Sequence, residues 1–162
     1  MRSLKPLQPV VKIEGVVEHG FGRGSKSLGF PTANLNGQAS RSLSEFLVSP
    51  KCSDGVYIGW ATIESNPSVF KAAISVGINP TFEDSRVRLL EAHLIDYNGP
   101  NFYDSKLRLV LVGFIRESKK FESLDALKDA IWSDCEFARQ WLDKNMTGNT
   151  EPASTKFLHW ED

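Results

Sequence analysis

Short segments in which apolar and polar residues alternate recur along the first two thirds of the chain. Such segments, rich in β-branched and aromatic residues and bounded by Gly, Pro, Asn or Asp, are typical of β-strands. The polar stretch over 36–54 lacks this alternation and predicts a long connection. Strands are predicted over 10–17, 56–63, 69–78, 87–96 and 106–116.

Apolar residues recur every third or fourth position in the last third of the chain, which is the period of a helix with one buried face. Ser123 is a suitable N-cap because its hydroxyl can accept a hydrogen bond from the first turn. We therefore predict a helix from Ser123 to about Lys144. Its apolar face consists of Leu124, Leu127, Ile131, Ala138 and Leu142.

Several short strands followed by one helix, without βαβ alternation, favour a mainly β fold. The expected architecture is a single closed antiparallel β-barrel with the C-terminal helix packed outside. The chain 1–162 is then one domain, with the barrel over about 10–122, the helix over about 123–144 and a polar tail over 145–162. Three apolar residues of this tail either dock on the barrel or stay mobile: Phe157, Leu158 and Trp160.

Side chains alternate between the two faces of a strand, so each predicted strand also indicates which residues lie together. In the strand over 87–96, Glu91 and His93 share a face with two apolar residues, Leu89 and Ile95. A carboxylate therefore lies among apolar neighbours. In the strand over 106–116, Leu107, Leu109, Leu111 and Ile115 point one way and Lys106, Arg108 and Arg116 point the other.

The composition is that of an ordinary soluble globular protein, with 41% hydrophobic and 24% charged residues. A net charge of −1 gives no argument for a nucleic-acid or membrane-surface partner, and no apolar run is long enough to span a bilayer. Cys52 and Cys135 are not in metal or redox spacing and are predicted to be structural thiols in a reducing compartment.

The segment from Gly20 to Leu35 carries the clearest chemistry. Four of the ten residues over 20–29 are glycine, so backbone N–H groups can wrap an anion, and Arg23 and Lys26 add positive charge. The following Pro-Thr-Ala-Asn, over 31–34, offers a hydroxyl and an amide oxygen, ligands that suit a hard cation. Neither the P-loop nor the dinucleotide-binding pattern fits, and a plain glycine-rich turn between two strands is the alternative.

The run from Gly20 through Gly24 to Asn34 resembles the signature of the riboflavin kinase (flavokinase) family. Further stretches are similar to the family in the same order: 54–61, 75–82, 90–94, 102–103 and 116–124. Two positions depart from the family's usual pattern. Asp104 stands where glycine is usual, and Glu117-Ser118 stands where Pro-Glu is usual, which bears on the shape of the flavin-side loop.

The resemblance implies a monofunctional, eukaryotic-type riboflavin kinase with a Greek-key barrel. It would transfer the γ-phosphate of ATP to the ribityl 5′-hydroxyl of riboflavin, giving FMN and ADP, with Mg²⁺ as the expected ion and Zn²⁺ or Mn²⁺ as alternatives. The adenylyltransferase domain of bacterial relatives would not fit in 162 residues. The expected partners are riboflavin and ATP, with no nucleic acid and no membrane, for a cytoplasmic monomer.

The resemblance also implies roles for individual residues. Glu91 is the expected general base, and Thr32 and Asn34 are the expected metal ligands. The expected ATP-binding positions are Gly20, Gly22, Gly24, Lys26, Leu94, Asp96 and Tyr103, of which the last three form the adenosine end. The expected flavin-side positions are Arg116, Lys119 and Phe121.

Each of these residues also has a structural interpretation. Glu91 could be a satisfied strand carboxylate, Asn34 could form an Asx-type turn, and Arg116 could belong to a solvated basic strand end. His93 is predicted to be packed or hydrogen-bonded, because no third metal ligand lies nearby in the sequence. Two other functions compete: a flavin-binding barrel that phosphorylates nothing, and an oligonucleotide-binding barrel, which would need a basic groove with exposed aromatics.

Overall fold

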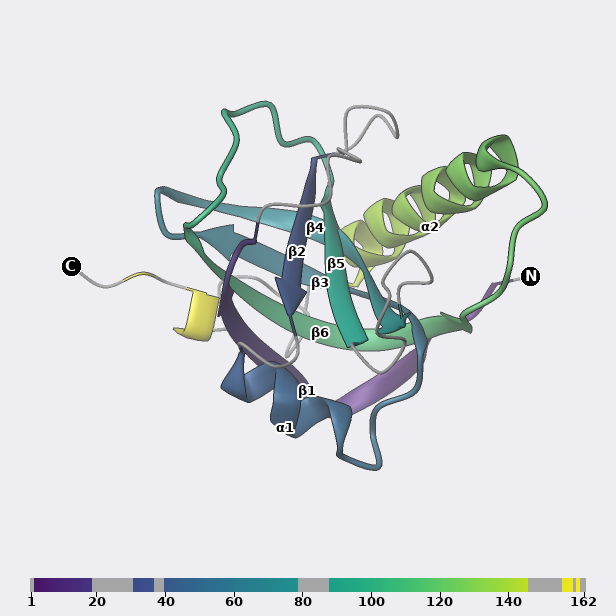
Figure 1. Cartoon of the computed structure of the whole chain (residues 1–162), viewed down its shortest axis with the longest axis horizontal. Helices are drawn as coiled ribbons and strands as arrows, with labels where there is room; N and C mark the ends of the chain where they lie inside the picture. Colours follow the sequence, from purple (N-terminus) through teal and green to yellow (C-terminus); the bar gives the residue numbers. More distant parts are fainter. Residues whose placement is uncertain are drawn as a thin grey trace.

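The strands form one curved antiparallel sheet in the computed structural model of the chain (Figure 1). The structure describes residues 2–18, 31–36, 40–78, 88–145, 156–158 and 160. Within these residues the elements follow in this order: β1 (Lys5–Val16), β2 (Thr32–Asn36), α1 (Arg41–Leu47), β3 (Gly55–Ile63), β4 (Asn66–Ile78), β5 (Arg88–Leu94), β6 (Lys106–Glu117), α2 (Leu124–Lys144) and the 3-10 turn η4 (Lys156–Leu158).

The strand order across the sheet is β1-β6-β3-β4-β5-β2, and every neighbouring pair is antiparallel. The two edge strands approach each other just beyond β1, where the Glu18 N–H donates to the Asn34 carbonyl at 2.9 Å in an isolated bridge. A mainly β, antiparallel fold with a C-terminal helix is thus confirmed. A continuous ladder that would close the predicted barrel is not present in the described residues.

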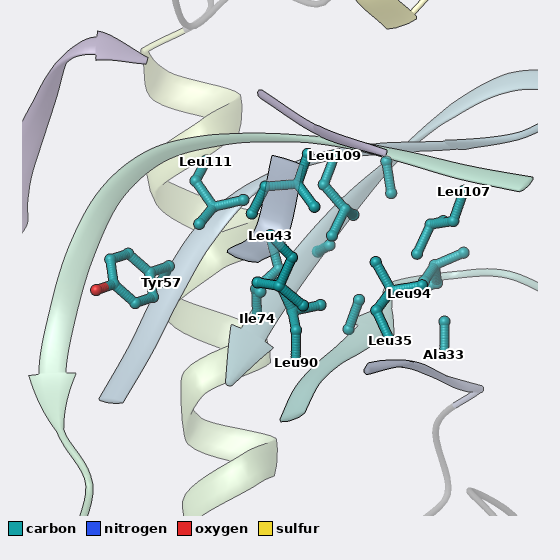
Figure 2. Close-up of a cluster of buried hydrophobic side chains, with 14 of the residues drawn as sticks. Ala33, Leu35, Leu43, Tyr57, Ile74, Leu90, Leu94, Leu107, Leu109 and Leu111 are labelled. Carbon is teal, nitrogen blue, oxygen red and sulfur yellow. The ribbon is translucent and has the colours of Figure 1, made fainter. Parts of the chain in front are cut away.

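The curved sheet has an inner face and an outer face, and each carries its own hydrophobic cluster. All six strands and α1 contribute to the inner cluster, where Leu35, Leu90 and Leu109 lie together (Figure 2). On the outer face, β3 and β4 pack against α2 (Figure 1). Burial of both clusters is the main favourable contribution to folding.

Helix α2 has the predicted bounds and the predicted cap. The Ser123 hydroxyl accepts a hydrogen bond from the Ala126 N–H at 3.1 Å, and Asp125 in the first turn complements the positive end of the helix dipole. The residues that α2 buries are Ile131, Asp134, Cys135, Ala138 and Leu142. The placement of Leu124 on the buried face is wrong, because Leu124 lies in the first turn of the helix and is 57% exposed. No helix in the described part of the chain is apolar over enough residues to cross a bilayer.

Strand β1 begins earlier than the sequence pattern predicts. The predicted strand covered 10–17, whereas the ladder with β6 begins at Lys5. Pro6 and Pro9 interrupt the pattern, because proline cannot donate a ladder hydrogen bond. The register shifts between Pro6 and Val11, so the sheet accommodates both prolines at its edge.

The polar stretch predicted as a long connection holds the helix α1. The Ser40 hydroxyl caps it, accepting from the Leu43 N–H at 3.2 Å and donating to the Glu14 carbonyl of β1 at 2.8 Å. Only Leu43 and Phe46 of α1 are buried, so the helix is too short to show a helical period in the sequence. Strand β2 begins at Thr32 and so includes the Thr-Ala-Asn part of the Pro-Thr-Ala-Asn segment, which was not predicted as a strand.

The face assigned to Ile115 is wrong, because β6 is irregular where it pairs with β3. The register shifts between Val56 and Tyr57 and again between Ile58 and Gly59. A bulge changes which face the next side chain meets. Ile115 therefore packs with the outer cluster, apart from Leu107, Leu109 and Leu111. A Cβ at Gly59 would collide with the Val110 carbonyl, so the irregularity requires glycine there.

The described part of the C-terminal tail docks on the sheet. Leu158 is buried in the outer cluster, and Phe157 packs against that cluster. The Arg108 guanidinium lies 3.9 Å from the centroid of the Trp160 ring and donates to the Phe157 carbonyl at 3.1 Å. Of the two alternatives for these tail residues, docking is the one observed.

Truncation of an inner leucine should show how much the fold depends on the inner cluster. Leu109→Ala removes a fully buried side chain of β6 and should lower the free energy of unfolding by about 2–5 kcal/mol, because the cavity cannot fully collapse. The matched control is Leu124→Ala, since Leu124 is 57% exposed, with an expected change of about 0.5 kcal/mol or less. Urea unfolding measures both, and equal losses would contradict the assignment of the core.

Candidate active site

One transverse row of side chains crosses five strands on the outer face. The register pairs Asn34 with Glu91, Glu91 with Ser75, Ser75 with Val56, and Val56 with Arg116. Directly paired residues of antiparallel strands point to the same face. The row therefore joins the predicted metal ligand Asn34, the predicted base Glu91 and the predicted flavin-side residue Arg116 on one surface.

Glu91 lies inside this row, half-buried, with Asn34 on one side and Ser75 on the other. Burial raises the pKa of the Glu91 carboxyl above its ordinary value, because the charged form loses hydration. A carboxylate with a raised pKa holds a proton more strongly than an exposed one. Glu91 therefore has the property required of a general base.

Thr32 and Asn34 occupy alternate positions of β2 and so share the face of Glu91. Thr32 Oγ1 lies 3.1 Å from Nδ1 of His93, the residue paired with it across the ladder, in a hydrogen bond whose donor depends on the tautomer. The prediction that His93 is hydrogen-bonded is confirmed. No group of three metal-ligating His, Cys, Asp or Glu residues occurs in the described ranges.

His93 is 4% exposed, and its ring stays uncharged at neutral pH. Burial lowers the pKa of His93 to about 4, although the nearby Asp134 carboxylate acts to raise it. A neutral imidazole does not repel a cation, and its hydrogen bond restricts the rotation of the Thr32 hydroxyl. The geometry around Thr32 is thus compatible with a bound divalent ion.

The predicted flavin-side residues lie together at the other end of the row. The centroid of the Phe121 ring is 5.7 Å from Arg116 Cζ and 5.5 Å from Lys119 Nζ. Asp134 of α2 binds Arg116 through both carboxylate oxygens. An aromatic face with two cations on it can receive a planar ring that carries polar or negatively charged edges.

The predicted adenosine-end residues do not join the row. Leu94 is fully buried in the inner cluster (Figure 2), on the opposite face of β5 from Glu91. Asp96 is exposed and pairs with Arg139 of α2 at 3.0 Å, and Tyr103 packs against the inner cluster. The predicted phosphate-binding residues lie outside the described residues: Gly20, Gly22, Gly24 and Lys26.

The backbone nevertheless connects these adenosine-end positions to both ends of the glycine segment. On the entry side, the Asp104 N–H donates to the Val17 carbonyl at 2.8 Å. On the exit side, the Leu94 N–H donates to the Pro31 carbonyl at 3.1 Å. The segments that carry Leu94 and Tyr103 thus flank the two described ends of the glycine segment.

Asp104, one of the two departures from the family pattern, has φ of 67°. Glycine adopts this left-handed conformation most easily, and Asp and Asn tolerate it better than other residues. Aspartate in place of the usual glycine therefore preserves the turn that holds Val17.

Two residues near the row were not predicted from the sequence, Ser75 and Asp134. Ser75 gave no local signal, because only the pairing of β4 with β5 brings it next to Glu91. Asp134 did give one: it stands three residues after Ile131 and four before Ala138, so it is a charged residue on an apolar helix face. A buried charge at that spacing indicates a specific ion pair.

Comparison with known proteins agrees with this geometry. The sequence profile of the Flavokinase family, described as riboflavin kinase, matches residues 7–142. The chain belongs to the riboflavin kinase family. The predicted family is therefore confirmed, and with it the predicted class of enzyme, an ATP:riboflavin 5′-phosphotransferase.

Individual riboflavin kinases match most of the chain. The riboflavin kinase of Pyricularia oryzae is 41% identical over 147 residues, covering 82% of this chain and 71% of that protein. The riboflavin kinase of Mus musculus is 40% identical over 129 residues, covering 80% and 79% respectively. The crystal structure of riboflavin kinase from Trypanosoma brucei has a TM-score of 0.61 at 27% identity, covering 91% of this chain and 84% of that one.

The raised pKa of Glu91 predicts a stability effect that is separate from catalysis. The folded state binds a proton at Glu91 more strongly than the unfolded chain, so Glu91 loses its stabilising contribution as the pH rises through its folded pKa. Glu91→Gln should therefore raise Tm relative to the parent at pH 8. The gain should shrink toward pH 4, near the ordinary Glu pKa of about 4.3.

Thermal unfolding at several pH values measures this difference. Glu64→Gln, at an exposed turn position between β3 and β4, is the matched control and should give a small difference that varies little with pH. A Glu91→Gln variant that is less stable than the parent at pH 8 would show that the ionised carboxylate is stabilised by its surroundings.

Proposed function

We propose that Glu91 is the general base of the riboflavin kinase reaction in this chain. The observation that carries the proposal is the position of Glu91 in the transverse row, between Asn34 and Ser75 and in line with Arg116. A substrate laid along the row would have its reacting hydroxyl near the carboxylate. In this arrangement the flavin lies toward Arg116 and the ATP phosphates lie toward Asn34.

The chemistry is a phosphoryl transfer with one proton transfer. The ribityl 5′-oxygen of riboflavin forms a bond to the γ-phosphorus of ATP, and the bond from that phosphorus to the oxygen bridging the β-phosphate breaks. The Glu91 carboxylate accepts the proton of the 5′-hydroxyl, and the products are FMN and ADP. Positioning and charge stabilisation supply most of the catalysis in such reactions, and a base typically adds about 10²–10⁴-fold.

Thr32 and Asn34 are the proposed ligands of Mg²⁺, with Zn²⁺ or Mn²⁺ as alternatives. Their hydroxyl and amide oxygens share one face beside Glu91, and both side chains are half-buried. Few protein ligands suffice, because Mg²⁺ keeps several waters and binds substrate phosphates. Bound there, Mg²⁺ would offset the negative charge of the ATP phosphates.

The proposed nucleotide site continues from Thr32 into the glycine segment, with Gly20, Gly22, Gly24 and Lys26 as phosphate-binding positions. Backbone hydrogen bonds at Glu18 and Pro31 support this location, because they hold the ends of the segment next to β2 and β5. Leu94, Asp96 and Tyr103 stay the proposed adenosine end. Of these, Leu94 would need to become accessible, since it is fully buried here.

Arg116, Lys119 and Phe121 are the proposed flavin site. Three strand spacings separate Arg116 from Glu91 along the row, which is about 14 Å at about 4.8 Å per strand. This separation leaves room for a flavin ring near Phe121 with its ribityl chain directed toward Glu91. The two cations would meet the polar edge of the ring or the phosphate of FMN.

The broader proposal is a monomeric, cytoplasmic enzyme with a single domain whose Greek-key sheet closes as a barrel through the contact between Glu18 and Asn34. The bridge between these residues supports closure. A net charge of −1 supports small-molecule substrates in place of nucleic acid or a membrane surface.

The proposed base predicts a specific loss of turnover. Glu91→Gln should lower kcat by about 10²-fold or more, because the amide cannot accept the proton. FMN formation from riboflavin, ATP and Mg²⁺, followed by chromatography, measures the change. Glu64→Gln removes a carboxylate from an exposed turn and should retain the parent's rate.

Two results would count against this proposal. A Glu91→Gln variant with the parent's kcat would remove Glu91 from its role and leave the kinase activity intact. Flavin binding by the parent without FMN formation under any nucleotide would favour the flavin-binding barrel instead.

The proposed metal ligands predict a changed requirement for Mg²⁺. Asn34→Ala should raise the Mg²⁺ concentration for half-maximal rate by about tenfold or more, with partial recovery at high Mg²⁺. The control is Asn36→Ala, on the same strand and face but paired with Leu89, outside the row. If both variants show the parent's Mg²⁺ dependence, Asn34 does not hold the ion.

A further inference from the structure

Asp134 is a carboxylate on the buried face of α2. It is 2% exposed, and its neighbours on that face are the buried residues Ile131, Cys135 and Ala138. A charge in such a position is costly unless it is paired and hydrogen-bonded. The pairing partners of Asp134 must therefore explain how a carboxylate is stabilised at this buried position.

Two arginines share the Asp134 carboxylate. Arg116 of β6 donates from Nη2 to Oδ2 at 2.8 Å and from Nε to Oδ1 at 3.0 Å, which is the bidentate geometry of a strong pair. Arg2 donates from Nη1 to Oδ1 at 2.8 Å. The side chains of Asp134 and Arg116 are 3% and 18% exposed, so solvent screens this pair little.

The two-point contact fixes the plane of the Arg116 guanidinium. A single contact would let the group rotate, whereas two parallel hydrogen bonds define both its position and its orientation. The guanidinium nitrogen that does not contact Asp134, Nη1, donates to the Glu117 carbonyl at 3.3 Å. Arg116 Cζ lies 5.7 Å from the centroid of the Phe121 ring. The two hydrogen bonds from Arg116 to Asp134 thus hold Arg116 beside Phe121 independently of any ligand.

The second arginine keeps the cluster positive. Asp134 alone would neutralise Arg116, but with Arg2 the three side chains carry a formal charge of +1, and Lys119 beside Phe121 adds to it. A fixed guanidinium in a positive surrounding is suited to an electron-rich ring edge or a phosphate.

We propose that Asp134 is a positioning residue for flavin binding, which acts by holding Arg116 and through it the cation and aromatic pair formed with Phe121. The inference rests on the proposed assignment of Arg116, Lys119 and Phe121 to the flavin site. It adds a residue of α2, distant in sequence, to the determinants of that site.

The test measures riboflavin binding and catalysis separately in full-length variants. Asp134→Asn keeps the size of the side chain and removes its charge. It should raise the riboflavin Kd, followed by flavin fluorescence, and the riboflavin KM by about tenfold, the scale typical of residues that orient a binding group. The KM for ATP should change little, because Asn34 lies at the other end of the row.

Arg2→Gln is the matched control, because it removes the other cation from the same carboxylate. It should lower Tm and change the riboflavin Kd less than Asp134→Asn does. Combining Arg116→Gln with Asp134→Asn should weaken binding no further than Arg116→Gln alone, because residues that act through one another are not additive.

Arg116→Lys gives a second test that leaves the buried carboxylate paired with a cation. Lysine keeps the charge but cannot form two parallel hydrogen bonds to the carboxylate. The riboflavin Kd of this variant should therefore rise by about the same factor. A riboflavin Kd equal to the parent's in Arg116→Lys, or in a folded Asp134→Asn, overturns the proposal. A parent-like Kd in Arg116→Gln shows instead that the flavin-site assignment is wrong.

Discussion

The register of the antiparallel sheet is the constraint on which the site depends. Asn34, Glu91, Ser75, Val56 and Arg116 come from five strands, and only their pairing places them in one row. A slip of one residue in any ladder would turn that strand's contribution to the inner face. The buried leucines and alanines of the inner cluster prevent such slips, so core packing fixes the position of the polar row.

Helix α2 gives the outer face two different environments. Over β3 and β4 it covers apolar side chains, and at Asp134 it brings a carboxylate close to both Arg116 and His93. Burial on this face also lowers the pKa of His93 and raises the pKa of Glu91, since each charged form loses hydration. The packing of α2 on the sheet therefore orients the Arg116 guanidinium through Asp134.

Strong local patterns were sufficient for part of the fold. The alternation in β3 and β6, and the helical period with Ser123 ahead of α2, predicted these elements within a few residues. Helix α1 buries too few residues to show a period, and bulges moved Ile115 to the other face. Neither feature is encoded in local alternation, because the first depends on the Ser40 cap and the second on the partner strand.

The site was predictable as a set of residues but not as an arrangement. Glu91, Thr32 and Asn34 stood out by family resemblance, yet their adjacency follows from the pairing of β2 with β5. In the sequence these two strands are separated by α1, β3 and β4. Likewise Asp134 was visible as a charge on an apolar face, whereas Arg116 as its partner depends on how α2 packs on the sheet.

The hydrogen bonds at Val17, Glu18 and Pro31 anchor the two described ends of the glycine-rich segment, which spans the sequence between them. The entropy of closing such a span grows only with the logarithm of its length. Because the folded sheet already holds both ends of the glycine-rich span, substitutions that disturb these anchors should separate the ends, and a bound ligand would then have to bring them together again.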